Sequence, residues 1–266
     1  MDRHYHLLRR LHSLTGVVPI GAFLFPHLTT NSAIVWGWLG KSEISDEALQ
    51  QADVAGHRGV EAFQHEVNFI HDLPALILIE IVVLWLPIAY HGLMGLYFAR
   101  TGRSNAARYG YAANRRYMLQ RLTGYIGLIY LFVHISSLRW GWTYFGLIGS
   151  FDPGAASSTT AEHFQSGPLG YIMPVIYLIG VLSLVYHFAN GLWTAAITWG
   201  VTVSEQAMQR WGYVCAVIGI LLGGAGVAAI AGFTFLDIEQ AREIENILAS
   251  PAVEPAHSGE LVQGGE

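Results

Sequence analysis

The chain has 266 residues, of which 53% are hydrophobic and only 12% are charged, and its net charge is −5. A soluble domain carries about twice that charged fraction. The high hydrophobic fraction excludes a disordered chain. The negative net charge, without a dominant basic block, excludes a nucleic-acid-binding surface. The single cysteine, Cys215, excludes an intramolecular disulfide framework and a cysteine-ligated iron–sulfur cluster held by this chain alone. With 30 glycines and 8 tryptophans, the composition favours a membrane protein with several spans.

Five stretches of the chain are long and apolar enough to cross a bilayer, whose hydrocarbon core takes about 20 residues of helix. Tryptophans and tyrosines gather near their ends, which is typical of the aromatic belts at membrane surfaces. The sequence therefore predicts an all-α integral membrane bundle over residues 1–236, followed by an acidic tail over residues 237–266 that begins as an amphipathic surface segment and is partly flexible. In chain order, the predicted spans are residues 14–38, 73–98, 122–145, 169–199 and 213–235.

Basic residues are divided unequally between the two sides of this bundle. Ten of the 14 lysines and arginines precede the first span or lie in the connections from span two to three and from four to five, and four lie on the other side. Since cytoplasmic loops carry the excess of basic residues, we expect the N-terminus in the cytosol and the C-terminus outside.

Two short motifs each occur twice. Leu-Thr-Gly stands at the start of the first and third spans, in residues 14–16 and 122–124, and a histidine follows the glycine after 11 and 10 residues. Spans two and four share the pattern Tyr-His-x-x-x-Gly-Leu-aromatic, in residues 90–97 and 186–193. The pattern predicts a duplicated two-helix hairpin whose copies run in the same direction, with a fifth helix appended.

Each of the first four spans carries one histidine at depth: His27, His91, His134 and His187. Ionisable residues inside a bilayer are rare and usually functional, although a helix–helix hydrogen bond is the alternative for any one of them. Axial ligation of b-type haem takes two neutral imidazoles, one on each face of the ring. The repeat pairs His27 with His134 and His91 with His187, which predicts an outer and an inner haem b.

Polar side chains near the inner edge are candidates to bond the anionic haem propionates. Alternatively, they set the topology or extend their charged ends to the membrane surface. His12 is also a competing candidate for a quinone site. The propionate candidates are Arg10, His12, Ser13, Gln120, Arg121 and Asn190.

Over residues 9–236 the chain resembles the membrane-anchor cytochrome b subunits of the succinate:quinone oxidoreductase superfamily. It is similar to the single-chain, two-haem type found in the Bacillus-type succinate dehydrogenase (cytochrome b558) and in related fumarate reductases. The family's axial ligands match the same four histidines in the same two pairs. The matching stretches are residues 9–28 (RRLHSLTGVVPIGAFLFPHL), 86–99 (LPIAYHGLMGLYFA), 119–134 (LQRLTGYIGLIYLFVH) and 181–203 (VLSLVYHFANGLWTAAITWGVTV).

The resemblance implies an assembly in a bacterial cytoplasmic membrane. A flavoprotein subunit with FAD and an iron–sulfur subunit would dock on the cytosolic face, and the succinate site would lie there, outside this chain. Electrons would pass through the inner and then the outer haem to a quinone near the outer face, menaquinone in the low-potential versions. The direction, succinate oxidation or fumarate reduction, stays open.

The candidate quinone site lies near the start of the second span, where Glu66, His71 and Asp72 could exchange protons with a quinol. A solvated, acidic helix start is the alternative. Some two-haem fumarate reductases carry a glutamate where this chain has Val185, so Glu80 is either a substitute proton carrier or a buried neutral acid. The histidines expected at the surface are His4, His6, His57, His163 and His257.

Three other functions fit part of the pattern. A proton-coupled transporter could use the buried histidines and Glu80, and a purely structural anchor could have lost electron transfer. The anchor of another respiratory dehydrogenase would be expected to place two ligands on one helix, which this sequence does not do. The number of haems bound per chain distinguishes a dihaem cytochrome from the transporter and from the purely structural anchor.

Overall fold

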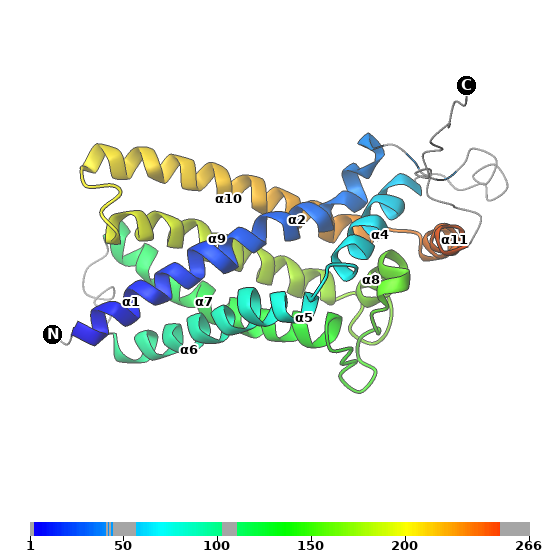
Figure 1. The fold of residues 1–266 in the computed structure, drawn as a ribbon, viewed down its shortest axis with the longest axis horizontal. Coiled ribbons are helices and arrows are strands. Elements are labelled where there is room, and N and C mark those ends of the chain that lie inside the picture. Colours follow the sequence, from blue (N-terminus) through cyan, green and yellow to red (C-terminus); the bar gives the residue numbers. More distant parts are fainter. Residues whose placement is uncertain (1–2, 41, 43, 45–56, 103–110, 251–266) are drawn as a thin grey trace, which may run out of the picture.

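The computed structural model describes residues 3–40, 42, 44, 57–102 and 111–250, and within these ranges the chain forms helices and loops but no strand. Five helical segments are long and apolar enough to cross a membrane, and they run side by side along the molecule (Figure 1). The all-α bundle of five spans is therefore confirmed. The segments are His4–Trp36, Leu76–Thr101, Asn114–Leu138, Met173–Thr198 and Glu205–Thr234.

The first two spans are interrupted helices and the other three are continuous. In each of the first two, a π-helical turn separates two α-helical pieces. The first span consists of α1 (Arg3–Thr15), η1 (Gly16–Ile20) and α2 (Gly21–Trp36), and the second of α5 (Leu76–Ile79), η3 (Glu80–Trp85) and α6 (Leu86–Thr101). The continuous helices are α7 (Ala112–Leu138), α9 (Met173–Thr198) and α10 (Glu205–Thr234).

Several predicted ends were wrong by a few residues. α7 stops at Leu138 instead of continuing to residue 145, because the chain then turns through left-handed backbone at Gly141, Tyr144, Phe145 and Gly146. The apolar side chains of this loop gave it the hydropathy of a span. Conversely, α10 begins well before residue 213, since its polar first turns lower the hydropathy but still form a helix.

α9 is the central helix of the bundle. It packs against α7 on one side and α10 on the other, α2 packs along α10, and α6 packs along α1. Figure 1 shows that α1 and the start of α10 lie at the same end of the molecule as the N-terminus. We call this end the N-end.

The opposite end, which we call the capped end, is covered by three short helices: α4 (His57–His71), α8 (Ala156–Gln165) and α11 (Ile238–Ala249). They pack on one another and on the end of α10 (Figure 1). The rings of Phe63 and Phe233 meet there edge to face with centroids 4.9 Å apart. Part of the segment expected as a tail is thus a packed helix, while residues 251–266 lie outside the described ranges.

The carboxylate of Glu245 on α11 holds the cap together. It is buried, and it accepts hydrogen bonds from the backbone N–H groups of Ser157 at 2.7 Å and Ser158 at 3.0 Å, and from the hydroxyl of Ser158. These two N–H groups open α8 and have no partner inside the helix, so a carboxylate from another helix supplies the N-terminal cap.

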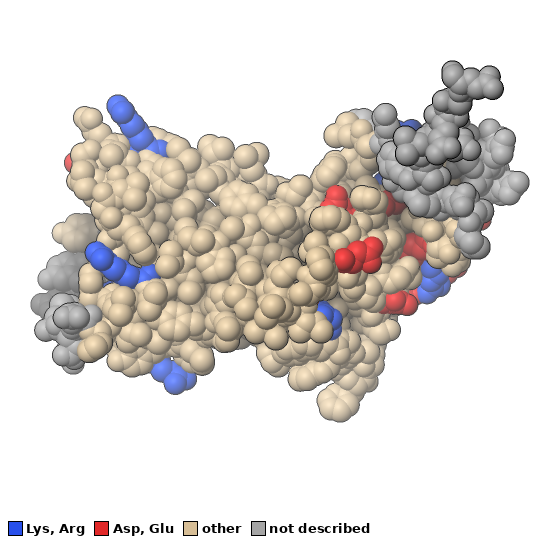
Figure 2. Space-filling model, in the orientation of Figure 1, with Lys and Arg blue, Asp and Glu red and all other residues tan. Residues whose placement is uncertain are grey.

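Charges separate along the bundle. The described arginines of the N-end include Arg9, Arg10, Arg100, Arg116 and Arg210, whereas the capped end carries most of the acidic side chains, and Figure 2 shows this division on one face. The middle of the same face is free of both, as expected for a surface in contact with lipid.

Replacing Glu245 should destabilise the cap. Glu245→Ala leaves the α8 N–H groups buried without an acceptor, and hydrogen bonds to a charged group contribute about 1.5–3 kcal/mol each. We expect the Tm in detergent to fall by about 5–10 °C. The matched control is Glu243→Ala on the exposed side of α11, which should leave the Tm unchanged; an equal fall in both variants would contradict the assignment.

Candidate functional site

The four histidines of the first four spans meet as the two pairs that the repeat predicts. His27 on α2 and His134 on α7 have ring centroids 5.7 Å apart and planes at 82°. His91 on α6 and His187 on α9 have centroids 6.0 Å apart and planes at 87°. We call them the capped-end pair and the N-end pair, and each joins helices that are not neighbours in the chain.

The π-helical turn in the first span explains the unequal spacing of the repeat. His27 follows Gly16 by 11 residues, whereas His134 follows Gly124 by 10. A π turn holds one more residue than an α turn, and η1 starts at Gly16, whereas α7 is continuous. The extra residue is absorbed, so both histidines reach the same level and face each other.

Both imidazoles of the N-end pair are held by a backbone carbonyl. Nδ1 of His91 lies 2.9 Å from the carbonyl oxygen of His12, and Nδ1 of His187 lies 3.0 Å from that of Gln120. Positions 12 and 120 are equivalent in the repeat, two residues before each Leu-Thr-Gly. A carbonyl only accepts, so each ring donates its Nδ1–H and leaves the Nε2 lone pair free for a metal.

The glycines of the Leu-Thr-Gly motifs make room for these two rings. A Cβ atom on Gly16 would lie 2.4 Å from Cε1 of His91, and one on Gly124 would lie 3.0 Å from Cε1 of His187. Any side chain at either position would displace the imidazole. The repeated motif therefore combines a carbonyl acceptor with a cradle for the ring.

Aromatic rings surround the capped-end pair. Phe23 stacks on His27 with centroids 5.1 Å apart, and Tyr130 stacks on His134 at 5.6 Å. A Cβ on Gly180 would lie 2.2 Å from the Tyr130 ring, so the ring can pack here only because residue 180 has no side chain. Nδ1 of His134 is buried without a hydrogen-bond partner among the described residues, unlike its counterparts in the N-end pair.

The donor set fits a metal held in a flat macrocycle. Each pair offers two imidazoles, and the described residues contain no group of three or more His, Cys, Asp or Glu side chains that could hold a metal ion. A macrocycle supplies the four remaining ligands itself.

Comparison with known proteins identifies the family of the chain. The chain is 36% identical over 227 residues to the succinate dehydrogenase cytochrome b558 subunit of Bacillus subtilis (strain 168). The aligned region covers 85% of this chain and 95% of that relative. The chain belongs to this family of cytochrome b subunits. No family model matches the chain.

A fifth histidine of this chain, His12, stacks on His91 of the N-end pair. The two rings are nearly parallel, at 12°, with centroids 4.0 Å apart, and Nδ1 of His12 is buried without a partner among the described residues. Nitrogen lone pairs lie in the plane of the ring, so two stacked imidazoles cannot ligate one metal from opposite sides. His187, and not His12, therefore has the geometry of a second ligand with His91.

Two of the propionate candidates form a chain of hydrogen bonds that ends on the backbone of His187. Gln120 donates from Nε2 to the His187 carbonyl at 3.0 Å, and Asn190 donates to Oε1 of Gln120 at 2.7 Å. By contrast, Arg10 is exposed, and Arg121 donates to the hydroxyl of Tyr117 at 3.4 Å.

The remaining propionate candidate, Ser13, is half-buried on α1 beside His12. Thus the structure brings His12, Gln120 and Asn190 to the histidines and leaves Arg10 and Arg121 pointing to other partners or to solvent.

The quinone candidates lie shortly before the second span, where the sequence predicted them. Glu66 and His71 belong to the later turns of α4 and Asp72 follows it, and the second span begins at Leu76. They are thus near the C-terminal end of a cap helix. His71 and Asp72 are exposed and Glu66 is half-buried.

Glu80 is not an isolated neutral acid. Both of its carboxylate oxygens accept hydrogen bonds from the guanidinium of Arg139, each at 3.0 Å. The rings of Trp85 and Trp140 stack beside this ion pair with centroids 5.5 Å apart. The pair fastens the end of α7 to the second span, and the carboxylate has a fixed positive partner.

His163 was expected at the surface, and this was wrong. It lies on α8 with 1% of its surface exposed, and Nε2 is 3.2 Å from the hydroxyl of Tyr177, whose ring packs against His134 with centroids 5.7 Å apart. The short polar α8 carries no hydropathy signal. Its one available sign was the spacing of Thr160, His163 and Phe164 on one helix face.

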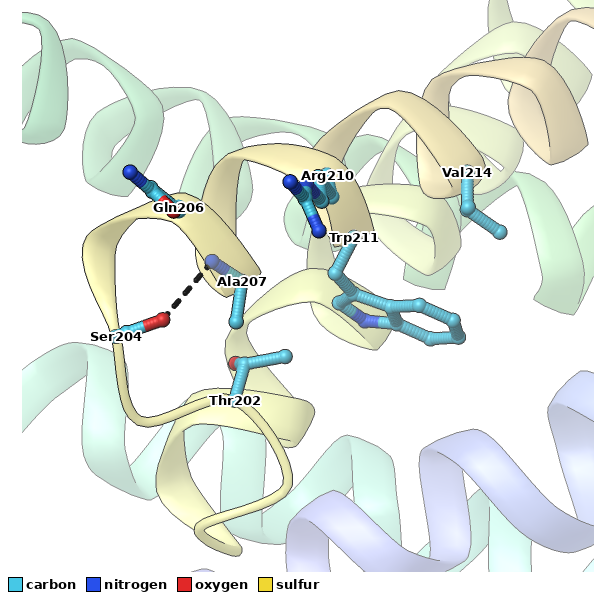
Figure 3. A pocket seen from close by; sticks show the side chains of 7 residues that line it. All are labelled: Thr202, Ser204, Gln206, Ala207, Arg210, Trp211 and Val214. Atoms are coloured by element: carbon cyan, nitrogen blue, oxygen red, sulfur yellow. Dashed lines mark hydrogen bonds between the residues drawn. The ribbon is translucent and has the colours of Figure 1, made fainter.

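A pocket at the N-end lies apart from both histidine pairs. It has a volume of about 370 Å³ and opens at the start of α10, where the Ser204 hydroxyl accepts a hydrogen bond from the N–H of Ala207 (Figure 3). None of the paired histidines lines it. The lining residues are Thr202, Ser204, Gln206, Ala207, Arg210, Trp211 and Val214.

The stability of the cap should depend on pH through His163. Burial lowers the pKa of His163 below 6.5, and the hydrogen bond to the Gly149 carbonyl offsets part of this. The unfolded chain then binds more protons near and below pH 6.5, so stability is complete above that pH and falls as the pH is lowered. We expect the Tm to decrease between pH 7 and pH 5.

The variant His163→Gln should flatten this pH dependence, because glutamine does not titrate. The control is His65→Gln, on the exposed surface of α4, which should retain the full slope of Tm against pH. A slope that survives His163→Gln unchanged would assign the effect to other groups.

Proposed function

We propose that the chain is the membrane subunit of a succinate:quinone oxidoreductase, and that it binds two haem b groups between partner subunits and a membrane quinone. The observation that carries this proposal is the presence of two imidazole pairs, each joining different spans, in a chain related to a cytochrome b subunit. The relative's name, a subunit of succinate dehydrogenase, supports the assignment to that complex.

Each bound haem supplies a one-electron iron couple. The four histidines would hold the two irons, His91 and His187 at the N-end and His27 and His134 at the capped end. The carbonyls of His12 and Gln120 accept from Nδ1–H and so fix the first two imidazoles in the tautomer that would ligate through Nε2. His12, Gln120 and Asn190 would be the polar side chains available to the propionates of the N-end haem, because they lie beside the N-end pair.

The distribution of arginine sets the proposed orientation. The N-end carries most of the described arginines, and cytoplasmic loops are enriched in such residues. A flavoprotein with FAD and an iron–sulfur subunit would therefore dock on the N-end, on the cytosolic face of a bacterial membrane. Electrons would enter at the N-end pair and leave from the capped-end pair.

A quinone, in our proposal menaquinone, would react beside the capped-end pair. Glu66, His71 and Asp72 lie on the cap at this end and are accessible for proton exchange with solvent. Glu80 is a weaker candidate for carrying protons because Arg139 neutralises it. The same ion pair counts against a proton-coupled transporter, which would need an exchangeable carboxylate in the span.

The ligand assignment predicts haem loss by pairs. His91→Ala or His187→Ala should reduce the content from two haems to one per chain by removing the N-end haem, because one imidazole alone no longer holds a six-coordinate iron. His27→Ala or His134→Ala should remove the other. Haem per chain and the reduced optical spectrum measure this, with the exposed His4→Ala as control; wild-type content in the four variants would refute it.

The assembly predicts partner subunits and a coupled activity. Purification through this chain should retain a flavoprotein with FAD and an iron–sulfur subunit, identified by mass spectrometry. The complex should reduce a menaquinone analogue with succinate, or run the reaction in reverse with fumarate. If the chain bound two haems but purified with a different dehydrogenase, the assignment as a dihaem cytochrome would stand and the assignment to succinate:quinone oxidoreductase would be refuted.

A further inference from the structure

The threonine of each Leu-Thr-Gly motif bonds back to its own helix. The hydroxyl of Thr15 donates to the carbonyls of Leu11 at 2.9 Å and His12 at 3.0 Å. The hydroxyl of Thr123 donates to the carbonyls of Leu119 at 2.7 Å and Gln120 at 3.3 Å. Each hydroxyl is thus a shared donor between the carbonyls three and four residues earlier.

One carbonyl in each set is the one that holds a histidine of the N-end pair. The His12 oxygen accepts from both the Thr15 hydroxyl and Nδ1 of His91, and the Gln120 oxygen accepts from both the Thr123 hydroxyl and Nδ1 of His187. A carbonyl oxygen has two lone pairs, and a second donor withdraws electron density from the first bond. The hydroxyl therefore weakens the bond that each imidazole makes.

Back-bonding of threonine in helices is common, so the bond alone carries no function. Thr101 and Thr198 make it too, to the carbonyls of Tyr97 and Thr194, which hold no histidine. What distinguishes Thr15 and Thr123 is that the same three-part arrangement of hydroxyl, carbonyl and imidazole occurs at both equivalent positions of the repeat.

We propose that Thr15 and Thr123 are positioning residues that set the redox potential of the N-end haem through these shared carbonyls. The inference rests on the proposed function, since it needs His91 and His187 to be axial ligands. A stronger Nδ1–H···O bond makes an imidazole more basic, and a more basic ligand favours ferric over ferrous iron. The two hydroxyls, by weakening that bond, keep the potential of this haem high.

The direction and order of the effect follow from the geometry. Removing a hydroxyl leaves one donor fewer on the carbonyl and so strengthens its bond to the imidazole, and the potential should fall. Thr15 is nearer its shared carbonyl than Thr123, at 3.0 against 3.3 Å, so its removal should act more strongly. A threefold to tenfold gain of ferric over ferrous binding corresponds to about 30–60 mV at about 59 mV per tenfold for one electron.

The test is a redox titration of the haems in the purified complex. Thr15→Val should lower the potential of the N-end haem by about 30–60 mV, Thr123→Val should lower it by less, and the capped-end haem should not change. Variants that lack one histidine pair assign the two potentials. Thr15→Ser restores a hydroxyl and should restore the potential, and the matched control Thr101→Val should leave both potentials unchanged.

The outcomes separate this inference from the proposed function. A wild-type chain that binds fewer than two haems would end the proposed function, whatever the threonines do. Two bound haems with an unchanged potential in both Val variants would overturn the threonine proposal alone. If Thr15→Val lost the N-end haem, Thr15→Ala would remove the hydroxyl without the extra methyl group, and its potential would decide between the same two results.

Discussion

Two hydrogen bonds from imidazole N–H groups to backbone carbonyls fix the rings of the N-end pair. They join His91 to residue 12 and His187 to residue 120, so each crosses between the two helices of one repeat. A backbone acceptor is present whatever side chain the position carries, and it is fixed in the helix. The side chains could therefore diverge to an imidazole at 12 and an amide at 120 while the ring geometry stayed the same.

That divergence gives the two halves of the N-end site different surroundings. On one side His12 stacks on His91, and on the other Gln120 and Asn190 form a chain of hydrogen bonds to the backbone of His187. The capped-end pair is different again, with aromatic rings in place of carbonyl acceptors. The repeated motifs thus frame two imidazole pairs in unlike environments, which is what unequal redox potentials require.

The sequence predicted the five spans and which histidines meet, because apolar length and a repeated motif are properties of the chain itself. It could not predict that η1 absorbs the extra residue before His27, since a π turn has no distinctive composition. It also missed the burial of His163, the partner of Glu80 and the helical cap. Those depend on contacts between residues far apart in the chain, such as Gln64 with Pro153 and Glu245 with Ser158.

The cap on α8 has a consequence for the order in which the protein matures. The amides of Ser157 and Ser158 are made early, but the carboxylate that they bind, Glu245, follows the last span. During synthesis these amides must bind water until the fifth helix is inserted and α11 folds back. The capped end can therefore close only after all five spans have been made. A chain truncated after α10 would contain the five spans but would lack the carboxylate that caps α8.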